Sequence, residues 1–149
     1  MGAGGSITMN LTIPVIGIPK GQPRARAFVR RGCKHAGIYN PTTADDWKAC
    51  VYLAARQAMQ KAGFSGWAKD VPLCVHRAYL FPRPKRLRDR TGVPHVGKPD
   101  MDNLDKATYD AMQNAGVFHN DSQVSDGSER KRYADPGVAP GAVITIEEV

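Results

Sequence analysis

Residues 98–124 read KPDMDNLDKATYDAMQNAGVFHNDSQV, and this stretch decides how the whole chain is interpreted. From about Asp102 to Asn114 the apolar residues recur at helical spacing, and Gly116 follows as a typical helix stop. At about 100° per residue, one side of this helix is expected to pack on a sheet. The residues on that side are Leu104, Ala107, Thr108, Ala111 and Met112.

The opposite side of the predicted helix carries charge. Asp102 and Lys106 are four residues apart, so their side chains are neighbours, and a helix cap with an ordinary ion pair would explain these two alone. Asp100 lies two residues earlier in an extended lead, so both carboxylates can converge on the N-terminus of the helix, which also suits a phosphate. Asp121 follows after a short turn, and we expect it to return a third carboxylate to the same end.

Three close carboxylates repel one another unless a divalent cation lies among them, and Mg²⁺ favours carboxylate oxygens together with water and substrate phosphate. An EF-hand calcium loop is excluded, because Leu104, Asp105 and Ala111 stand where that loop needs an acid or Asn, a Gly and a Glu. A phosphatase-type DxD would follow a buried apolar strand, whereas VPHVGKP precedes this one. Asp100 and Asp102 by themselves also fit the DxD motif of a sugar transferase. That motif normally accompanies a nucleotide-binding domain, whose glycine pattern this chain lacks.

The rest of the chain is basic, with 21 Lys and Arg against 14 Asp and Glu among 149 residues, a formal net charge of +7. A solvated basic surface would explain the total, but the cations are clustered, which is typical of nucleic-acid binding. A basic protein with an acidic metal pocket is what a nuclease requires. The residues expected to contact DNA are Lys20, Arg24, Arg26, Arg30, Arg31, Arg83, Lys85, Arg86 and Arg88.

Cys33, Cys50 and Cys74 are an odd number without CxxC spacing, so we interpret them as free thiols in a reducing compartment. A zinc site built on Cys33 and His35 would lack its second pair of ligands. No apolar run reaches the roughly 18 residues of a membrane span. Residues 1–10 are expected to be a flexible N-terminal segment, and residues 11–149 a single domain.

The remaining elements complete an α+β fold: a single domain with a mixed β-sheet and two main helices packed on it. A helix capped by Thr42 or Thr43 is expected to run to about Lys61, with Trp47 as a core anchor. The segment RPKRLRDRTG is expected to be a mobile charged loop. The predicted strands are Ile7–Ile18 (broken or at an edge at Pro14), a hairpin of about Ala27–Arg30 with Ile38–Tyr39, Val71–Phe81, a strand from Val124, and Ala142–Val149.

KPDMDNLDKATYDAM followed by NDSQV resembles the RusA family of Holliday-junction resolvases. The hallmark of that family reads approximately K/R-P/x-D-x-D-N-hydrophobic-x-K, then D-A, then D-D-x-Q-V. The early GIPKGQPRAR is similar to the family's Pro- and Arg-rich first loop, and FPRPKR to the exit of its central strand. The resemblance covers about residues 13–149 in order and implies a RusA-like fold.

The resemblance assigns roles to individual residues. Asp100, Asp102 and Asp121 match the metal-binding and catalytic acids of the family, and Lys106 matches its essential lysine. Asn103 and Gln123 match flanking positions that would support these residues. Asn120 departs from the pattern, because it stands where the family commonly has the first of two consecutive acids.

The resemblance further implies a homodimer that resolves four-way DNA junctions by paired, symmetric incisions with Mg²⁺, for which Mn²⁺ is expected to substitute. It implies a phage or prophage enzyme of recombination and repair in the bacterial cytoplasm, with no membrane partner. Two alternatives remain open: a Mg²⁺-dependent nuclease for flaps or other branched DNA, and a non-catalytic basic DNA-binding module. A basic scaffold protein with a coincidental acidic cluster is a third interpretation.

Overall fold

A computed structural model describes residues 8–22, 26–29, 36–39 and 44–149, and every structural statement below concerns these residues. Strands and helices follow one another in a mixed order, which confirms the α+β expectation. The elements are β1 (Asn10–Ile16), β2 (Arg26–Val29), β3 (Ala36–Tyr39), α1 (Asp45–Ala62), β4 (Leu73–Phe81), η1 (Lys85–Leu87), α2 (Met101–Ala115), η2 (Asp121–Gln123), β5 (Val124–Tyr133) and β6 (Gly141–Glu148).

The main sheet has four strands in the order β1-β6-β4-β5 and is mixed, because β4 pairs with β5 in parallel while the other pairs are antiparallel. Pro14 lies opposite Val143 in β1, which is an edge strand as expected for a strand that contains proline. Asn10, placed in the flexible segment by the sequence, already pairs with Glu147. The hairpin β2–β3 forms a separate two-stranded sheet, and its expected turn lies outside the described residues.

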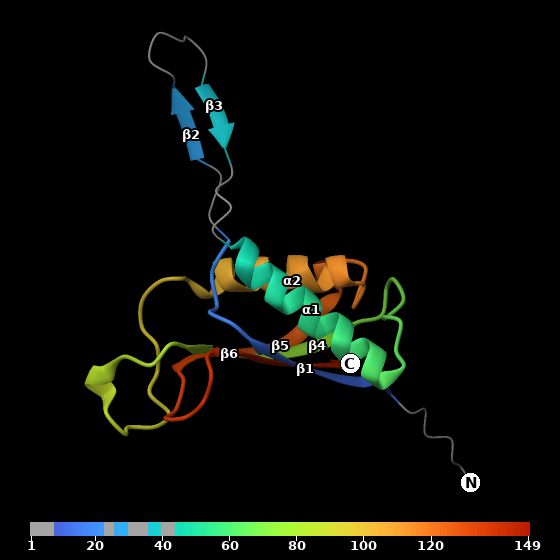
Figure 1. The fold of residues 1–149 in the computed structure, drawn as a ribbon. Helices are drawn as coiled ribbons and strands as arrows, with labels where there is room; N and C mark the ends of the chain where they lie inside the picture. Colours follow the sequence, from blue (N-terminus) through green and yellow to red (C-terminus); the bar gives the residue numbers. More distant parts are fainter. Residues whose placement is uncertain (1–7, 23–25, 30–35, 40–43) are drawn as a thin grey trace.

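Both long helices lie on one face of the four-stranded sheet (Figure 1). In β1 every second side chain, Leu11, Ile13 and Val15, is buried, because alternate residues of a strand point to opposite faces. Helix α1 buries Trp47, Val51, Ala55 and Met59 at the spacing of one helical turn, so Trp47 is the core anchor that the sequence predicted. The predicted inner face of α2, listed above from Leu104 to Met112, is buried in full.

The helix ends differ from the sequence expectation at one place. The N-cap of α1 is Ala44, which has no side-chain oxygen to cap the helix, and the predicted caps Thr42 and Thr43 lie outside the described residues. The C-terminal ends of the helices agree with expectation, since Gly63 and Gly116 adopt left-handed backbone with φ of 63° and 87°.

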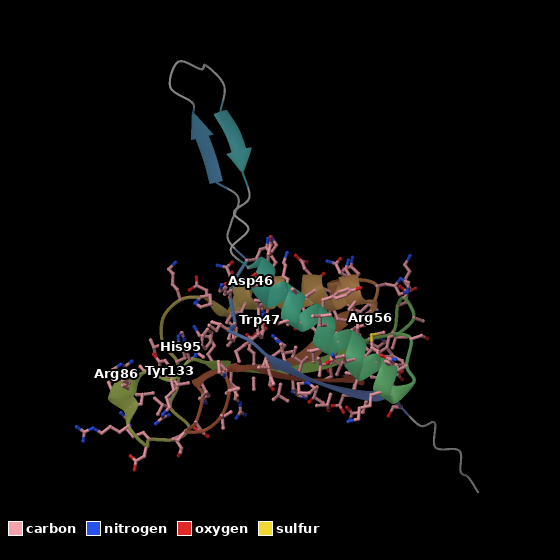
Figure 2. The ribbon with its side chains drawn as sticks, in the orientation of Figure 1. Asp46, Trp47, Arg56, Arg86, His95 and Tyr133 are labelled. Carbon is pink, nitrogen blue, oxygen red and sulfur yellow. The ribbon has the colours of Figure 1, made fainter. Side chains whose placement is uncertain are left out.

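The segment after β4, expected as a charged loop, contains a short helix that the sequence did not predict. Leu87 is only 1% exposed and anchors the short helix η1. Arg83 donates to the backbone oxygens of Leu87, Arg88 and Ala134, which satisfies carbonyls that a turn would otherwise leave to water. Figure 2 shows Arg86 near Tyr133 in this part of the molecule, where its guanidinium donates to the Tyr133 hydroxyl over 3.2 Å.

A polar network under α2 joins that helix to β4. Arg77 of β4 donates to Asp105 of α2 through Nε at 3.1 Å and Nη2 at 2.8 Å, a two-pronged ion pair with side chains 9% and 15% exposed. The Tyr79 hydroxyl donates to Asp105 at 2.8 Å, and Trp47 Nε1 donates to Thr108 at 3.1 Å. These directional contacts set the rotation of α2 over the sheet.

None of the helices in the described part of the chain has the length and apolar character needed to cross a bilayer.

Replacing Asp105 with Ala should lower the free energy of unfolding by about 3 kcal/mol, because the buried Arg77 cation loses its main partner. The matched control is Asp110→Ala on the same helix, whose 3.6 Å ion pair with Lys48 is more exposed and should contribute less than about 1 kcal/mol. Urea unfolding of the wild type and both variants measures the difference. Equal effects of the two substitutions would contradict the proposed role of the network.

Candidate active site

The start of α2 presents acidic side chains to solvent. Asp100 is the N-cap residue, and its carbonyl accepts the first helical hydrogen bond from Leu104 N at 3.0 Å, while its side chain makes no capping bond. Asp102 and Lys106 follow on the exposed face of the helix, one turn apart. Two carboxylates therefore lie where the helix also presents N–H groups without partners inside the helix and partial positive charge.

The segment that leads into α2 is held by β5. His95 N donates to Lys131 O at 3.1 Å, and the Lys131 ammonium donates to the carbonyl oxygens of Gly97 at 2.5 Å and Pro99 at 2.8 Å. The His95 ring also stacks on Phe81 with a centroid distance of 3.9 Å. The backbone on which Asp100 stands is thus tied to the sheet.

The first loop packs against the same helix end. Gln22 N donates to Asn103 O at 2.9 Å. A Cβ at Gly21 would come within 2.8 Å of the Pro99 Cβ and 3.0 Å of the Asn103 Cβ, so only glycine allows this close approach. Asn103 therefore supports the site through its backbone contact with the loop.

Asp121 opens the short helix η2, which its neighbours hold in place. The Gln123 side chain accepts from the backbone N–H of His119 at 2.8 Å and of Asn120 at 3.1 Å. Its amide also donates to Ala68 O at 3.0 Å and Val71 O at 3.1 Å, which ties the turn to the segment before β4. Gln123 is a buried support of the turn that carries Asp121.

Asn120, the departure from the family pattern, has a structural role in this chain. Its side-chain oxygen accepts from Ser122 N at 2.9 Å and, with Gln123, completes a capping box around η2. An Asp at this position could accept the same hydrogen bond, so Asn120 retains the cap without the charge.

The three aspartates do not meet at one point, contrary to the expectation from the sequence. Asp100, Asp102 and Asp121 are all described, yet they form no group whose ligand atoms lie within 4.8 Å of one another. Helix α2, with 15 residues, is about 22 Å long, and the short connection after it returns the chain only part of the way. Asp121 lies near Tyr109, which stands more than two helical turns after Asp100.

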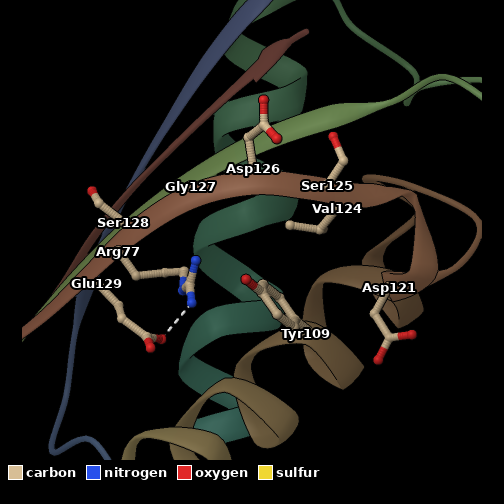
Figure 3. Close-up of a pocket in the computed structure, with 9 residues that line it drawn as sticks. All are labelled: Arg77, Tyr109, Asp121, Val124, Ser125, Asp126, Gly127, Ser128 and Glu129. Carbon is tan, nitrogen blue, oxygen red and sulfur yellow. Dashed lines mark hydrogen bonds and ion pairs between the residues drawn. The ribbon is translucent and has the colours of Figure 1, made fainter.

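Two of these acids, Asp100 and Asp121, line hollows in the surface. Asp121 lines a hollow of about 350 Å³ with Tyr109 and Arg77, and Asp100 lines another with Lys98 and Met101. Glu129 of β5 lines both hollows. Figure 3 shows Asp121, Tyr109 and Glu129 along one side of β5, with Arg77 beside Glu129. The acids therefore line two adjoining hollows that share Glu129.

Glu129 is a candidate site residue that sequence reasoning missed. It lies opposite Arg77 in the β4–β5 register and forms an ion pair with its guanidinium. The sequence of β5, VSDGSERKRY, has no apolar alternation, so it did not reveal which of its charged residues face the helix. The sequence analysis also missed Arg77 and Tyr109. Hydrophobic periodicity identifies apolar residues on an inner face, and it does not identify charged or polar residues there.

The pKa of Glu129 is raised, first by its hydrogen bond to Asp105 and then by burial, against the opposing influence of Arg77. Burial likewise raises the pKa of Tyr109, with contributions from Asp105, Glu129 and Asp121, whereas the Arg77 cation lowers it. Tyr109 is therefore a neutral phenol at physiological pH, and its hydroxyl can donate a hydrogen bond in the hollow that Asp121 lines. Glu129 therefore gains a proton more readily than an ordinary glutamate does.

The structure separates the predicted DNA-binding residues into three sets. Lys85, Arg86 and Arg88 are exposed on and beside η1 and can contact a polyanion. The Arg83 guanidinium instead donates hydrogen bonds to backbone carbonyl oxygens. The Lys20 Nζ atom lies 3.8 Å from a carboxylate oxygen of Asp46. Arg26 lies in β2, where only the backbone is described, and the remaining predictions, Arg24, Arg30 and Arg31, lie outside the described residues.

Comparison with known proteins identifies the family. Residues 16–147 match the family described as endodeoxyribonuclease RusA, which is most of the chain. The chain belongs to the RusA family. A search of the curated proteins gives no match. Membership makes this RusA chain an endodeoxyribonuclease, and it matches the resemblance inferred from residues 98–124.

The donor chemistry of this RusA site fits a hard divalent cation. Asp100, Asp102 and Asp121 offer only carboxylate oxygens, and all three residues are exposed. Glu129 adds a fourth carboxyl between the two hollows. Oxygen donors of this kind suit Mg²⁺ or Mn²⁺ better than softer metals.

Replacing Gln123 with Ala should loosen the turn that carries Asp121, because four hydrogen bonds are lost and buried backbone groups stay unpaired. We expect a loss of about 1–3 kcal/mol in unfolding free energy. The single-turnover rate of DNA cleavage should also fall under conditions where the variant is still folded. Gln113→Ala, an exposed position on α2, is the matched control, and equal behaviour of the two variants would refute the positioning role.

Replacing Glu129 with Gln should change how stability depends on pH. A raised pKa in the folded chain means that the contribution of Glu129 is complete below its ordinary pKa of 4.5 and is lost as pH rises through the raised value. The unfolding free energy of the variant relative to the wild type should therefore increase from about pH 4 to about pH 8. A difference that stays constant over this range would show that the Asp105–Glu129 contact does not retain a proton.

Proposed function

We propose that this RusA-family chain is a Mg²⁺-dependent endodeoxyribonuclease that resolves four-way DNA junctions in recombination and repair. The observation that carries the proposal is the placement of Asp100, Asp102 and Lys106 at the solvent-exposed start of α2, within a chain of net charge +7. Family membership supports the nuclease chemistry. The match of KPDMDNLDK and NDSQV to the resolvase hallmark supports the choice of junctions as substrate.

In this proposal Asp100 and Asp102 hold the Mg²⁺ ion, which Mn²⁺ can replace, and Asp121 acts from the adjoining hollow. The metal, when bound, polarises the scissile phosphate and lowers the pKa of a coordinated water. The backbone N–H groups at the start of α2 orient phosphate oxygens, because they have no partner within the helix. Lys106, one turn beyond Asp102, neutralises the charge that develops on those oxygens.

Glu129 and Tyr109 have supporting roles in the same proposal. Glu129 pairs with Arg77 and lies between the hollows, so it sets the charge of the surface that joins Asp100 to Asp121. The neutral hydroxyl of Tyr109 can donate a hydrogen bond in the Asp121 hollow, where burial keeps it protonated. Both residues orient charge and neither has to transfer a proton.

The exposed cations beside η1 supply affinity for DNA. Lys85, Arg86 and Arg88 contact phosphates without reading the base sequence, so binding should weaken as salt rises. A four-way junction is cut symmetrically in two strands, whereas each chain has one candidate active site that contains Asp100. We therefore include a homodimer in the proposal, and on the family resemblance a phage or prophage origin with the bacterial cytoplasm as the working compartment.

Asp100→Asn tests the site and the substrate together. The variant should retain binding to a synthetic four-way junction, while its Mg²⁺-initiated cutting should fall by about 10²–10³. The digest compares the junction with a flap and a linear duplex, and the matched control is Asp110→Asn, on the same helix but paired with Lys48.

Each result of this digest has a defined meaning. Wild-type cutting by Asp100→Asn would refute the active-site assignment. A wild type that cuts flaps and ignores junctions would keep the nuclease and exclude the resolvase. A wild type that binds junctions without cutting any substrate would favour the non-catalytic DNA-binding module.

A further inference from the structure

Three side chains with different donor atoms meet on the face of the sheet that the helices do not cover. Cys74 and His76 are two residues apart in β4, so they point to the same face, and Glu147 of β6 lies directly opposite Cys74 in the register. The Cys74 sulfur, a His76 ring nitrogen and a Glu147 carboxylate oxygen all lie within 4.8 Å of one another. No local sequence pattern indicates this group, because Glu147 is far from Cys74 along the chain.

The separations of these donors fit one small metal ion. The distance from Cys74 Sγ to His76 Nε2 is 3.3 Å, and from His76 Nε2 to Glu147 Oε1 it is 3.8 Å. Zinc bonds of about 2.0–2.3 Å in tetrahedral arrangement place neighbouring donor atoms roughly 3.3–3.8 Å apart. An ion could therefore bind with only small side-chain adjustments.

The imidazole of His76 is already held in an orientation that suits a ligand. Its Nδ1 lies 2.7 Å from the hydroxyl oxygen of Ser128, the residue opposite His76 in the β4–β5 register. This contact directs Nε2 toward Cys74 and Glu147. Histidine ligands of zinc typically have such a hydrogen bond on the other ring nitrogen, and it strengthens metal binding.

The local charge also favours a cation. Two carboxylate residues, Glu147 of β6 and Asp126 of β5, lie opposite Cys74 on either side of β4. Asp126 lies opposite Cys74 across the other edge of β4, and Figure 3 shows it on the side of β5 away from Tyr109 and Glu129. Asp126 is thus a neighbouring negative charge, outside the group of three donors. A metal would replace the thiol proton, since thiolate is the binding form.

We propose that Cys74, His76 and Glu147 form a second metal site, separate from the nuclease site and selective for zinc-like ions. The sulfur, nitrogen and oxygen donors differ from the oxygen-only set of Asp100, Asp102 and Asp121, so the two sites prefer different metals. The ion would join the start of β4 to the end of β6. Its role is structural, because binding to the folded sheet alone stabilises the fold by mass action.

The test uses metal-free full-length protein and two probes, Zn²⁺ and Co²⁺. The wild type should bind one Zn²⁺ at this site, its melting temperature should rise with added Zn²⁺, and Co²⁺ should give the visible absorption of a thiolate-bound ion. Cys74→Ala and His76→Ala should each weaken Zn²⁺ binding by more than about tenfold, and Ser128→Ala by about tenfold.

Matched controls separate this site from every other thiol and from the nuclease site. Cys50→Ala, which removes the other described free cysteine, and Cys33→Ala, outside the described residues, should both bind Zn²⁺ as the wild type does. Asp100→Asn should also keep Zn²⁺ binding, so the result is independent of the proposed nuclease mechanism. The proposal is overturned if the wild type binds no Zn²⁺, if Cys74→Ala binds it unchanged, or if Cys33→Ala abolishes binding.

Discussion

The ion pair between Arg77 and Asp105 is the interaction on which the rest of this structure depends. It joins the central strand β4 to α2 in a largely buried place, where a charge without its partner is costly. Tyr79 and Thr108 extend the pair toward Trp47, so both helices are tied to one polar network beneath them. Because apolar packing alone would tolerate small rotations of α2, this directional network determines which side of the helix presents Asp102 and Lys106 to solvent.

Strand β5 and the segments beside it then place the remaining acids. Lys131 holds the carbonyl groups just before Asp100, and Gln123 holds the turn that carries Asp121. Glu129 lies between these two supports and shares Arg77 with Asp105. Strand β5 therefore contacts the backbone before α2, and the short helix η2, directly before β5, contacts the backbone after it. These contacts fix the backbone positions of the exposed carboxylates Asp100 and Asp121.

The two faces of the sheet present different chemistry. The helix side gathers carboxylates and a neutral phenol in open hollows, which suits hard cations and phosphates. On the open side, Cys74, His76 and Glu147 bring softer donors together across two strands. This division follows from the period of a strand, since neighbouring residues such as Val75 and His76 point to opposite faces, and one sheet can carry two unrelated sites.

The sequence by itself determined the inner face of α2, the edge position of β1, the glycine helix stops and the family, because periodicity, proline and a long motif are local signals. It could not show that Glu129 faces the acids, that Arg83 also donates to the carbonyl of Ala134, or that Leu87 is buried, because these depend on how the chain folds back on itself. It also predicted that three aspartates meet at one point, whereas the length of α2 leaves Asp121 beside Tyr109. Only the tertiary structure decided those distances, since strand register and helix length, and not residue type, set where each side chain lies.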